Sequence, residues 1–271
     1  MTAAFHKAGK KVIVVLNIGG VIETASWKNI PDAVLLAWQA GQEGGNSVTD
    51  ILTGRQSPSG RLPMTFPVRL MDAGSSSNFP IDATREVYFT NRREDVGEKD
   101  VDRTVYAEDI YVGYRWFDKK GLEVSYPFGY GLSYTSFAYD EAVVKPAGDG
   151  FEASVKVTNT GAVAGKEVVQ LYVSAPAAGL DKPVRELKAY AKTRELKPGE
   201  SQVVTMKVDA YGLASFNEAS SAWEAAAGEY TVAFGASSRD LRAAVPFTLA
   251  EAGSWPVHDV LAPQQPIHKL L

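Results

Sequence analysis

The spacing of hydrophobic residues near the start of the chain predicts an α/β arrangement. Residues 12–16 and 33–38 are apolar runs without polar alternation, which is typical of strands covered on both faces. A glycine-rich turn at 41–46 leads into a segment whose apolar residues recur at helical spacing until Gly54. A strand, a crossover, a second strand and a glycine turn into a helix predict a partial α/β sandwich with a mostly parallel sheet over residues 1–90.

The opening residues predict the end of a helix rather than its beginning. Lys7, Lys10 and Lys11 surround Gly9, which is a suitable C-cap, and cations are favoured at a helix C-terminus. A helix this short is not stable alone, and two strands do not make a stable parallel sheet. We therefore expect the chain to begin inside an element of a larger fold, with exposed apolar faces at 12–16 and 34–38.

A polar and then aromatic stretch separates this region from the rest of the chain. Residues 57–103 are rich in turn formers and include a mixed-sign charge run at 91–103, which predicts an exposed connection or, as the alternative, a contact for a partner. The whole of 91–134 forms a connecting segment that becomes dense in tyrosine, phenylalanine and tryptophan. Its aromatic residues are interpreted either as a platform on which sugar rings stack or as a hydrophobic seam between two domains; the position in the chain favours the seam.

Beyond Tyr139 the hydrophobic period changes from helical to two. Apolar and polar residues alternate in five segments separated by turn signals; these segments are 151–158, 169–173, 187–191, 204–208 and 230–234. Short alternating strands with regular turns predict an antiparallel, all-β sandwich of about seven strands over residues 135–250. Residues 251–271, with several prolines, are expected to form an extended tail.

Composition and charge narrow the classes of function. The chain has 271 residues, 45% of them hydrophobic, and no cysteine, which excludes a disulfide framework and a thiolate metal site. The net charge of −4 argues against binding to nucleic acid or to an anionic membrane. There is no apolar run of about 20 residues to span a bilayer, and the start lacks the apolar region of a secretory signal.

Four carboxylates are candidates for acid–base chemistry. Glu23 follows the first predicted strand, Glu43 follows the second, and Glu108 and Asp109 lie in the aromatic segment. Ligands gather at the strand ends of an open parallel sheet, which makes Glu43 the best placed of the four. The interpretation that we favour for Glu43 is structural: an acid at a helix N-terminus complements the helix dipole and bonds free amides.

The other chemistry-bearing residues do not assemble into a site. The glycine turns at 17–20 and 41–46 match neither a dinucleotide nor a P-loop pattern and are better explained as tight turns. His6, His258 and His268 are scattered, so no histidine triad or metal site is predicted. We expect no catalytic, cofactor-binding or metal-binding residue in this chain.

A series of longer motifs runs in order through the sequence. They are GQEGGN at 41–46, GRLPMTFP at 60–67, EDIYVGYR at 108–115, FGYGLSYT at 128–135, VTNTG at 157–161, GKEV at 165–168, ELKA at 186–189, LKPGE at 196–200 and GASSRD at 235–240. Together they resemble the C-terminal part of glycoside hydrolase family 3, the β-glucosidase family. The resemblance covers the chain up to about residue 250.

The resemblance implies a complete enzyme with a TIM-like barrel, an α/β sandwich and a fibronectin type III-like domain. It also implies a retaining mechanism, in which a barrel Asp attacks the sugar and a Glu of the early α/β domain protonates the leaving oxygen, with the carboxyls roughly 5–5.5 Å apart. No residue of this chain matches the nucleophile motif or the acid/base loop. No catalytic residue is therefore transferred to this sequence, and Glu43 takes neither role.

Our hypothesis is that the chain is the C-terminal fragment of a retaining β-glucosidase, encoded by a truncated sequence whose Met1 corresponds to an internal position. The isolated chain would be inactive; in the parent enzyme it would support the acid/base loop and pack the open face of the barrel. The expected partners are the parent barrel domain and β-linked glucosides or oligosaccharides, with neither nucleic acid nor membrane. The alternatives are a non-catalytic module that binds carbohydrate or a partner chain, a subunit that complements a separate barrel, and a β-xylosidase parent.

Overall fold

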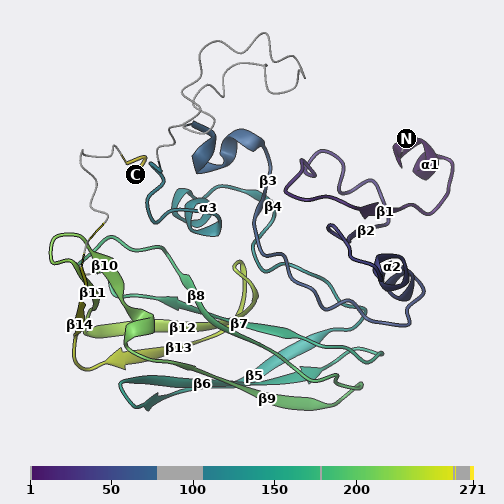
Figure 1. The fold of residues 1–271 in the computed structure, drawn as a ribbon. Helices are drawn as coiled ribbons and strands as arrows, with labels where there is room; N and C mark the ends of the chain where they lie inside the picture. The colour runs from purple at the N-terminus through teal and green to yellow at the C-terminus, as the bar shows by residue number, and fades with distance from the viewer. Residues whose placement is uncertain (1, 78–105, 178, 259, 261–268) are drawn as a thin grey trace, which may run out of the picture.

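The N-terminal part contains one small parallel sheet and two helices (Figure 1). The computed structural model describes residues 2–77, 106–177, 179–258, 260 and 269–271. The elements are α1 (Thr2–Lys7), β1 (Ile13–Leu16), β2 (Ala33–Leu36) and α2 (Gly44–Leu52). β1 and β2 pair in parallel, with Ile13 opposite Ala33, and α2 is followed by Gly54, whose φ of 75° suits the end of a helix.

Two short strands and a helix connect this sheet to the rest of the molecule. β3 (Phe66–Pro67) pairs antiparallel with β4 (Val124–Tyr126), while η1 (Leu70–Asp72) and η2 (Gly74–Ser77) are 3₁₀ turns. α3 (Tyr114–Lys120) ends at Gly121, which adopts a left-handed φ of 64°. The charge run at 91–103 lies outside the described residues.

The prediction of a mostly parallel sheet is wrong. β1 and β2 form a parallel pair, but β3 and β4 are antiparallel, as are the strand pairs described in the remainder of the chain. The strand pattern of the first fifty residues did not predict β3 and β4, because two and three residues are too few to show a hydrophobic period.

Seven strands form the two antiparallel sheets of a sandwich, as the period of two predicts. One sheet has the order β5 (Phe137–Ala147), β6 (Gly150–Asn159) and β9 (Ser201–Val208). The other has the order β13 (Asp240–Leu249), β12 (Gly228–Ser237), β7 (Val168–Ser174) and β8 (Glu186–Lys192). α3 lies over the four-stranded sheet (Figure 1).

The core of the molecule lies between these two sheets. Phe151 and Val155 of one sheet and Leu171 and Phe234 of the other are at most 1% exposed. The ring of Phe151 lies 4.8 Å from that of Phe247 across the core. Each fully buried side chain of this kind stabilises the fold by about 1.5–3 kcal/mol, so the sandwich has an apolar core of its own.

Part of the expected tail is a strand. β14 (Gly253–Pro256) pairs with β11 (Ala222–Ala225), which pairs with β10 (Ser215–Asn217), and η5 (Tyr211–Leu213) packs beside them. The aromatic rings of Trp223 and Trp255 on these strands lie against the core of the sandwich. The prolines of this stretch predicted a tail, because the sequence pattern does not reveal that Gly253–Pro256 pairs with β11.

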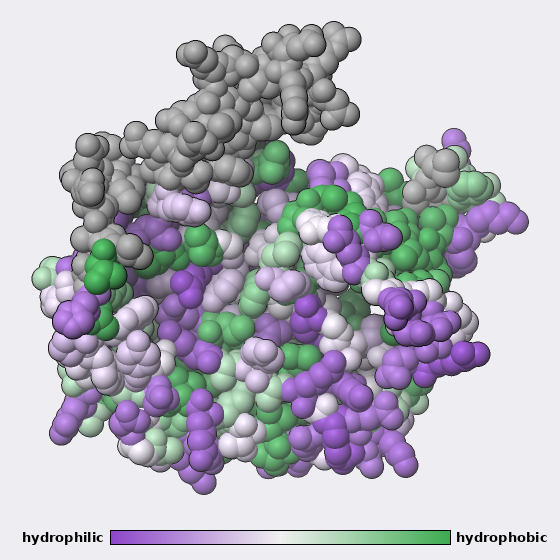
Figure 2. Space-filling view, viewed as in Figure 1, coloured by the Kyte–Doolittle hydropathy of each residue, from purple (hydrophilic) through white to green (hydrophobic). Residues whose placement is uncertain are grey.

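The small parallel sheet differs from the sandwich in being thinly covered. Ile13 and Val15 of β1 are 51% and 41% exposed, contrary to the expectation of burial on both faces. Figure 2 shows hydrophobic residues at the surface over β1 and β2. This matches the expectation that 12–16 expose an apolar face. No helix within the described residues is long and apolar enough to cross a membrane.

Candidate functional site

A groove lies between the carboxyl end of β2 and helix α2, where the sequence places its best candidate. It has a volume of about 600 Å³ and is lined mainly by small and aliphatic residues; these include Leu35, Leu36, Ala37, Ala40, Val48 and Ile51. Among its described lining residues, Glu43 is the one that carries a carboxylate. The groove therefore has an apolar wall and a single acidic group.

Glu43 occupies the N-cap position of α2 without capping the helix through its side chain. Its carboxylate accepts a hydrogen bond of 2.6 Å from the side-chain amide of Asn46, and its backbone carbonyl accepts one from Ser47 N–H. The favoured structural interpretation is therefore correct in position but not in detail, because Asn46 takes the place of the free backbone amides. General acid–base hydrolysis of a glycoside requires a second carboxylate, and the described residues that line the groove do not include one.

Glu23 stabilises the loop that follows β1. Its two carboxylate oxygens accept hydrogen bonds from the backbone N–H and the hydroxyl of Ser26, at 2.8 and 2.7 Å. These bonds, the hydroxyl bond foremost, lower the pKa of the Glu23 carboxyl, which keeps it ionised at neutral pH. A carboxylate held in this way forms a local turn and is a poor proton donor.

Glu108 and Asp109 belong to a turn that contacts the C-terminal end of the chain. Glu108 is buried, and Asp109 has a left-handed φ of 54°. The carboxylate of Asp109 forms an ion pair of 2.7 Å with Lys269, and the N–H of Leu270 donates to the carbonyl of Ala107. The described contacts of Asp109 thus join it to the C-terminus and not to the groove beside Glu43.

In each of the two glycine turns, one glycine lies close to a neighbouring side chain. A Cβ at Gly19 would lie 2.8 Å from the side-chain nitrogen of Gln39, and one at Gly44 would lie 2.6 Å from the Cβ of Ala40. The Cβ of Ala40 is fixed to the backbone, so packing accounts for glycine at position 44, whereas the flexible end of the Gln39 side chain could move away from a Cβ at position 19. A Cβ at Gly20, Gly41 or Gly45 would meet no atom within 4 Å, so packing explains one glycine of these turns and not the others.

Trp38 is a feature of the groove region that sequence reasoning missed. It follows β2 and has a left-handed φ of 53°, which is rare for a bulky residue and often marks a functional region. Its ring lies 6.4 Å from that of Phe66. No pattern in the sequence signals this backbone conformation.

The three histidines lie in different parts of the chain. His6 lies in α1, His258 is exposed beyond β14, and His268 lies outside the described residues. The described part of the chain contains no cluster of three or more histidine, cysteine, aspartate or glutamate side chains that could hold a metal ion.

The aromatic segment packs between the N-terminal part and the sandwich. The ring of Tyr114 stacks on Phe128 at 4.8 Å and meets Tyr172 of β7 edge-on at 6.1 Å. The hydroxyl of Tyr114 accepts a hydrogen bond of 2.8 Å from the backbone N–H of Leu187 in β8. Edge-to-face and stacked rings add to the energy of simple burial. These contacts support the interpretation of a seam over that of a sugar platform.

A buried glutamine connects the seam to the core sheet. The side-chain amide of Gln170 in β7 donates to the carbonyls of Gly129 and Ala236, and its oxygen accepts from the hydroxyl of Tyr172. Gly129 has a left-handed φ of 80°, and a Cβ there would lie 2.0 Å from the Gln170 oxygen. The glycine is therefore required both by its backbone and by the glutamine.

A buried ion pair makes a second connection between the two parts. Arg61, from the loop before β3, bonds to Glu167, which precedes β7, and both side chains are less than a tenth exposed. Glu167 also accepts a hydrogen bond from the N–H of Val168. Tyr139 is buried nearby, and desolvation together with the negative charge of Glu167 raises the pKa of its hydroxyl. Sequence reasoning missed this pair because its members are 106 residues apart.

Two family models match this chain. The model described as the glycosyl hydrolase family 3 C-terminal domain matches residues 1–134, and the model described as a fibronectin type III-like domain matches residues 167–238. Between them they include the groove, the seam and most of the sandwich.

Several characterised proteins are similar to the chain over most of its length. Beta-glucosidase A of Butyrivibrio fibrisolvens is 42% identical over 255 residues, which are 85% of this chain and 29% of that protein. The structure of beta-glucosidase 3B from Thermotoga neapolitana in complex with glucose superposes with a TM-score of 0.82 at 45% identity, over 94% of this chain and 33% of that one. The beta-glucosidase from Kluyveromyces marxianus in complex with glucose gives a TM-score of 0.79 at 36% identity, over 90% and 27%. The chain thus spans about a quarter to a third of the length of these relatives.

Proposed function

The chain belongs to glycoside hydrolase family 3, and we propose that it is the C-terminal portion of a retaining β-glucosidase that hydrolyses terminal β-D-glucosides. In this proposal the portion described here is the scaffold, and the catalytic carboxylates come from the remainder of the enzyme. The relatives reported above are named β-glucosidases, and two of their structures contain glucose.

One observation carries the assignment of a scaffold role. The groove at the carboxyl end of β2 presents a single carboxylate, Glu43, which is already bonded to Asn46. Retaining hydrolysis requires two carboxyls roughly 5–5.5 Å apart, one as nucleophile and one as acid/base. With Glu43 as the one carboxylate among its described lining residues, the groove does not supply both the nucleophile and the acid/base.

The thinly covered sheet is the surface through which the scaffold would meet the rest of the enzyme. Ile13 and Val15 of β1 are exposed, and the neighbouring groove is walled by aliphatic residues of β2 and α2. Exposed apolar surface of this kind is typical of a contact with another protein segment. We propose that the upstream part of the enzyme, including its barrel, covers this surface.

The connections across the seam would make that surface rigid. The Arg61–Glu167 pair, Gln170 and the aromatic rings of Tyr114 and Phe128 join the N-terminal part to a sandwich with its own core. A loop that must hold a catalytic acid within a fraction of an ångström benefits from such a support. In this proposal the sandwich would help to position the loop that holds the catalytic acid and would supply no catalytic residue itself.

A chimera tests this proposal. The C-terminal third of the Thermotoga neapolitana enzyme is replaced by this chain, and hydrolysis of an aryl β-glucoside is measured. We expect hydrolysis by the chimera, and we expect the Glu43→Gln chimera to retain it. A folded chimera that is inactive on β-glucosides, or a loss of hydrolysis in the Glu43→Gln chimera, would contradict the proposal.

A further inference from the structure

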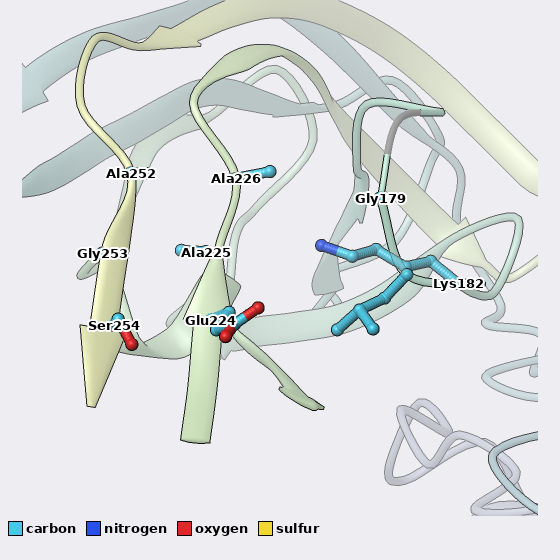
Figure 3. Close-up of a pocket in the computed structure, with 9 residues that line it drawn as sticks. Gly179, Lys182, Glu224, Ala225, Ala226, Ala252, Gly253 and Ser254 are labelled. Atoms are coloured by element: carbon cyan, nitrogen blue, oxygen red, sulfur yellow. The ribbon is translucent and has the colours of Figure 1, made fainter. Parts of the chain in front are cut away.

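A second, smaller cavity lies at the end of the sandwich, beside the sheet of β10, β11 and β14. It has a volume of about 220 Å³ and lies between residues 179–182 and the paired strands β11 and β14 (Figure 3). Drug-sized ligands occupy pockets of roughly 300–1,000 Å³, so this cavity suits a smaller molecule. Its polar groups are on Lys182, Glu224 and Ser254, and its apolar wall includes Ala225, Ala226 and Ala252.

Glu224 is held in place before any ligand arrives. The hydroxyl of Ser220 donates to one carboxylate oxygen at 2.6 Å, and the side-chain amide of Asn217 donates to the other at 2.9 Å. These bonds lower the pKa of the Glu224 carboxyl, so it is ionised at neutral pH. Each carboxylate oxygen retains capacity to accept a further hydrogen bond.

Lys182 faces the same space from the other side of the cavity (Figure 3). Its ammonium makes no hydrogen bond or ion pair within the described part of the chain. Glu186, another acid that acts on it, is paired with Arg115 at 3.0 Å and with Lys188 at 3.1 Å. Burial lowers the pKa of Lys182, which reflects the water that this ammonium has already lost. The cavity therefore contains a partly desolvated donor for which the described residues provide no hydrogen-bond acceptor.

The loop that carries Lys182 is fixed from the N-terminal part of the molecule. The hydroxyl of Tyr111 donates to the carboxylate of Asp181 at 2.6 Å, and the ammonium of Lys119 donates to its other oxygen at 2.9 Å. The Tyr111 hydroxyl also lies 3.3 Å from the carbonyl oxygen of Lys182. The position of the lysine is thus set by contacts outside the cavity, as expected of a preformed site.

We propose that this cavity binds a single neutral sugar ring. Hydroxyl groups donate to Glu224 and accept from Lys182, and charge-assisted bonds of this kind are about twice as strong as neutral ones. One positive and one negative group favour a neutral polyhydroxyl ligand, because an anion would face Glu224 and a cation would face Lys182. The alanine wall contacts the C–H face of the ring. The choice of a sugar among neutral polyols rests on the proposed function.

Alanine-methyl NMR on the full chain tests the site with glucose as the probe. We expect the methyl signals of Ala225, Ala226 and Ala252 to shift with a Kd of about 1–10 mM. Lys182→Met and Glu224→Gln are each expected to weaken binding by about tenfold, which corresponds to the loss of one charge-assisted hydrogen bond. Lys207→Met, at an exposed pair with Glu152 (3.5 Å), is the matched control and should leave binding unchanged.

Gluconate separates the neutral ligand from an anion. If the cavity is an anion site, gluconate binds more tightly than glucose, and Glu224→Gln strengthens its binding by removing a repulsive charge. Either result, or the absence of shifts with glucose up to about 100 mM, overturns the proposal. The readout is binding to this chain, so its failure leaves hydrolysis by the chimera unaffected, and the two proposals fail separately.

Discussion

The N-terminal sheet and the sandwich use similar residues but bury them to different degrees. Val155 and Val157 of β6 are fully buried, whereas Ile13 and Val15 of β1 are 51% and 41% exposed. Both strands are rich in β-branched residues, which suit a pleated and covered surface. The difference shows that such a run predicts a strand without specifying which segment covers it.

The sandwich supplies both layers of its own core, and the N-terminal sheet does not. A two-stranded sheet has little independent stability, so the N-terminal part depends on the seam that joins it to the sandwich. The seam contains Gln170, the Arg61–Glu167 pair and stacked aromatic rings. Substitutions in the sandwich core and substitutions in the seam should therefore both lower the free energy of unfolding, the first by removing apolar packing and the second by releasing the N-terminal part.

A pair of phenylalanine substitutions should give the largest contrast between the two regions. Phe151→Ala removes a ring that is 1% exposed and is expected to cost about 3–5 kcal/mol of unfolding free energy. Phe5→Ala removes a ring from α1 that is 54% exposed and is expected to cost less than about 0.5 kcal/mol. Urea unfolding followed by circular dichroism measures both. Equal losses would mean that α1 is as firmly packed as the sandwich core.

Breaking the buried ion pair should have the next largest effect. Glu167→Gln leaves the Arg61 guanidinium buried without its charge partner, which is expected to cost about 3 kcal/mol. The double variant Arg61→Met/Glu167→Leu should recover at least half of that loss, because no charge then remains buried. Hydrogen exchange of β1 and β2 amides should increase in the single variant before that of β6. A single variant as stable as the parent chain would show that the pair does not hold the seam.

The smallest effect on stability is expected at Asp181, an exposed carboxylate that Tyr111 and Lys119 bond, and this effect should depend on pH. Hydrogen bonds from Tyr111 and then Lys119 lower the pKa of Asp181 below its ordinary value. A carboxyl with a lowered folded-state pKa stabilises the protein above the unfolded value of about 4, and this contribution is lost as pH falls through the folded value. Asp181→Asn should therefore reduce stability at pH 6 and have less effect at pH 3.

Thermal unfolding at the two pH values measures this difference, and Asp149→Asn in the β5–β6 turn is the control. The change is expected to be small because the carboxylate is exposed and screened by solvent. An equal loss at both pH values would show that the side chain acts through packing rather than charge.

The elements that local pattern specifies were predictable, and the contacts between distant segments were not. Five of the seven sandwich strands, β6, β7, β8, β9 and β12, were located by a period of two and by turns such as the one at Gly199, whose φ is 79°. The bounds of β5 and β13 were not located in this way. β3 and β4 are two and three residues long and lie far apart in sequence, so no hydrophobic pattern signals their pairing. β14 was missed because the prolines of residues 251–271 predicted an extended tail.

The candidate site shows the same division. The sequence identified Glu43 and its place at the start of α2, because the glycine turn and the helical spacing are local. The left-handed backbone of Trp38 and the side chains that face Lys182 depend on tertiary contacts, which the pattern of a single sequence does not display. The sequence pattern thus located the end of β2 and the start of α2, whereas the side chains that surround each site follow from tertiary packing.

The most direct test of the scaffold assignment is an assay of the purified chain on an aryl β-glucoside, with and without Glu43→Gln. Under the scaffold proposal we expect no turnover above the uncatalysed rate from either protein, since retaining hydrolysis needs two carboxylates and Glu43 is the one among the described lining residues of the groove. Turnover by the chain that Glu43→Gln abolishes would contradict the account.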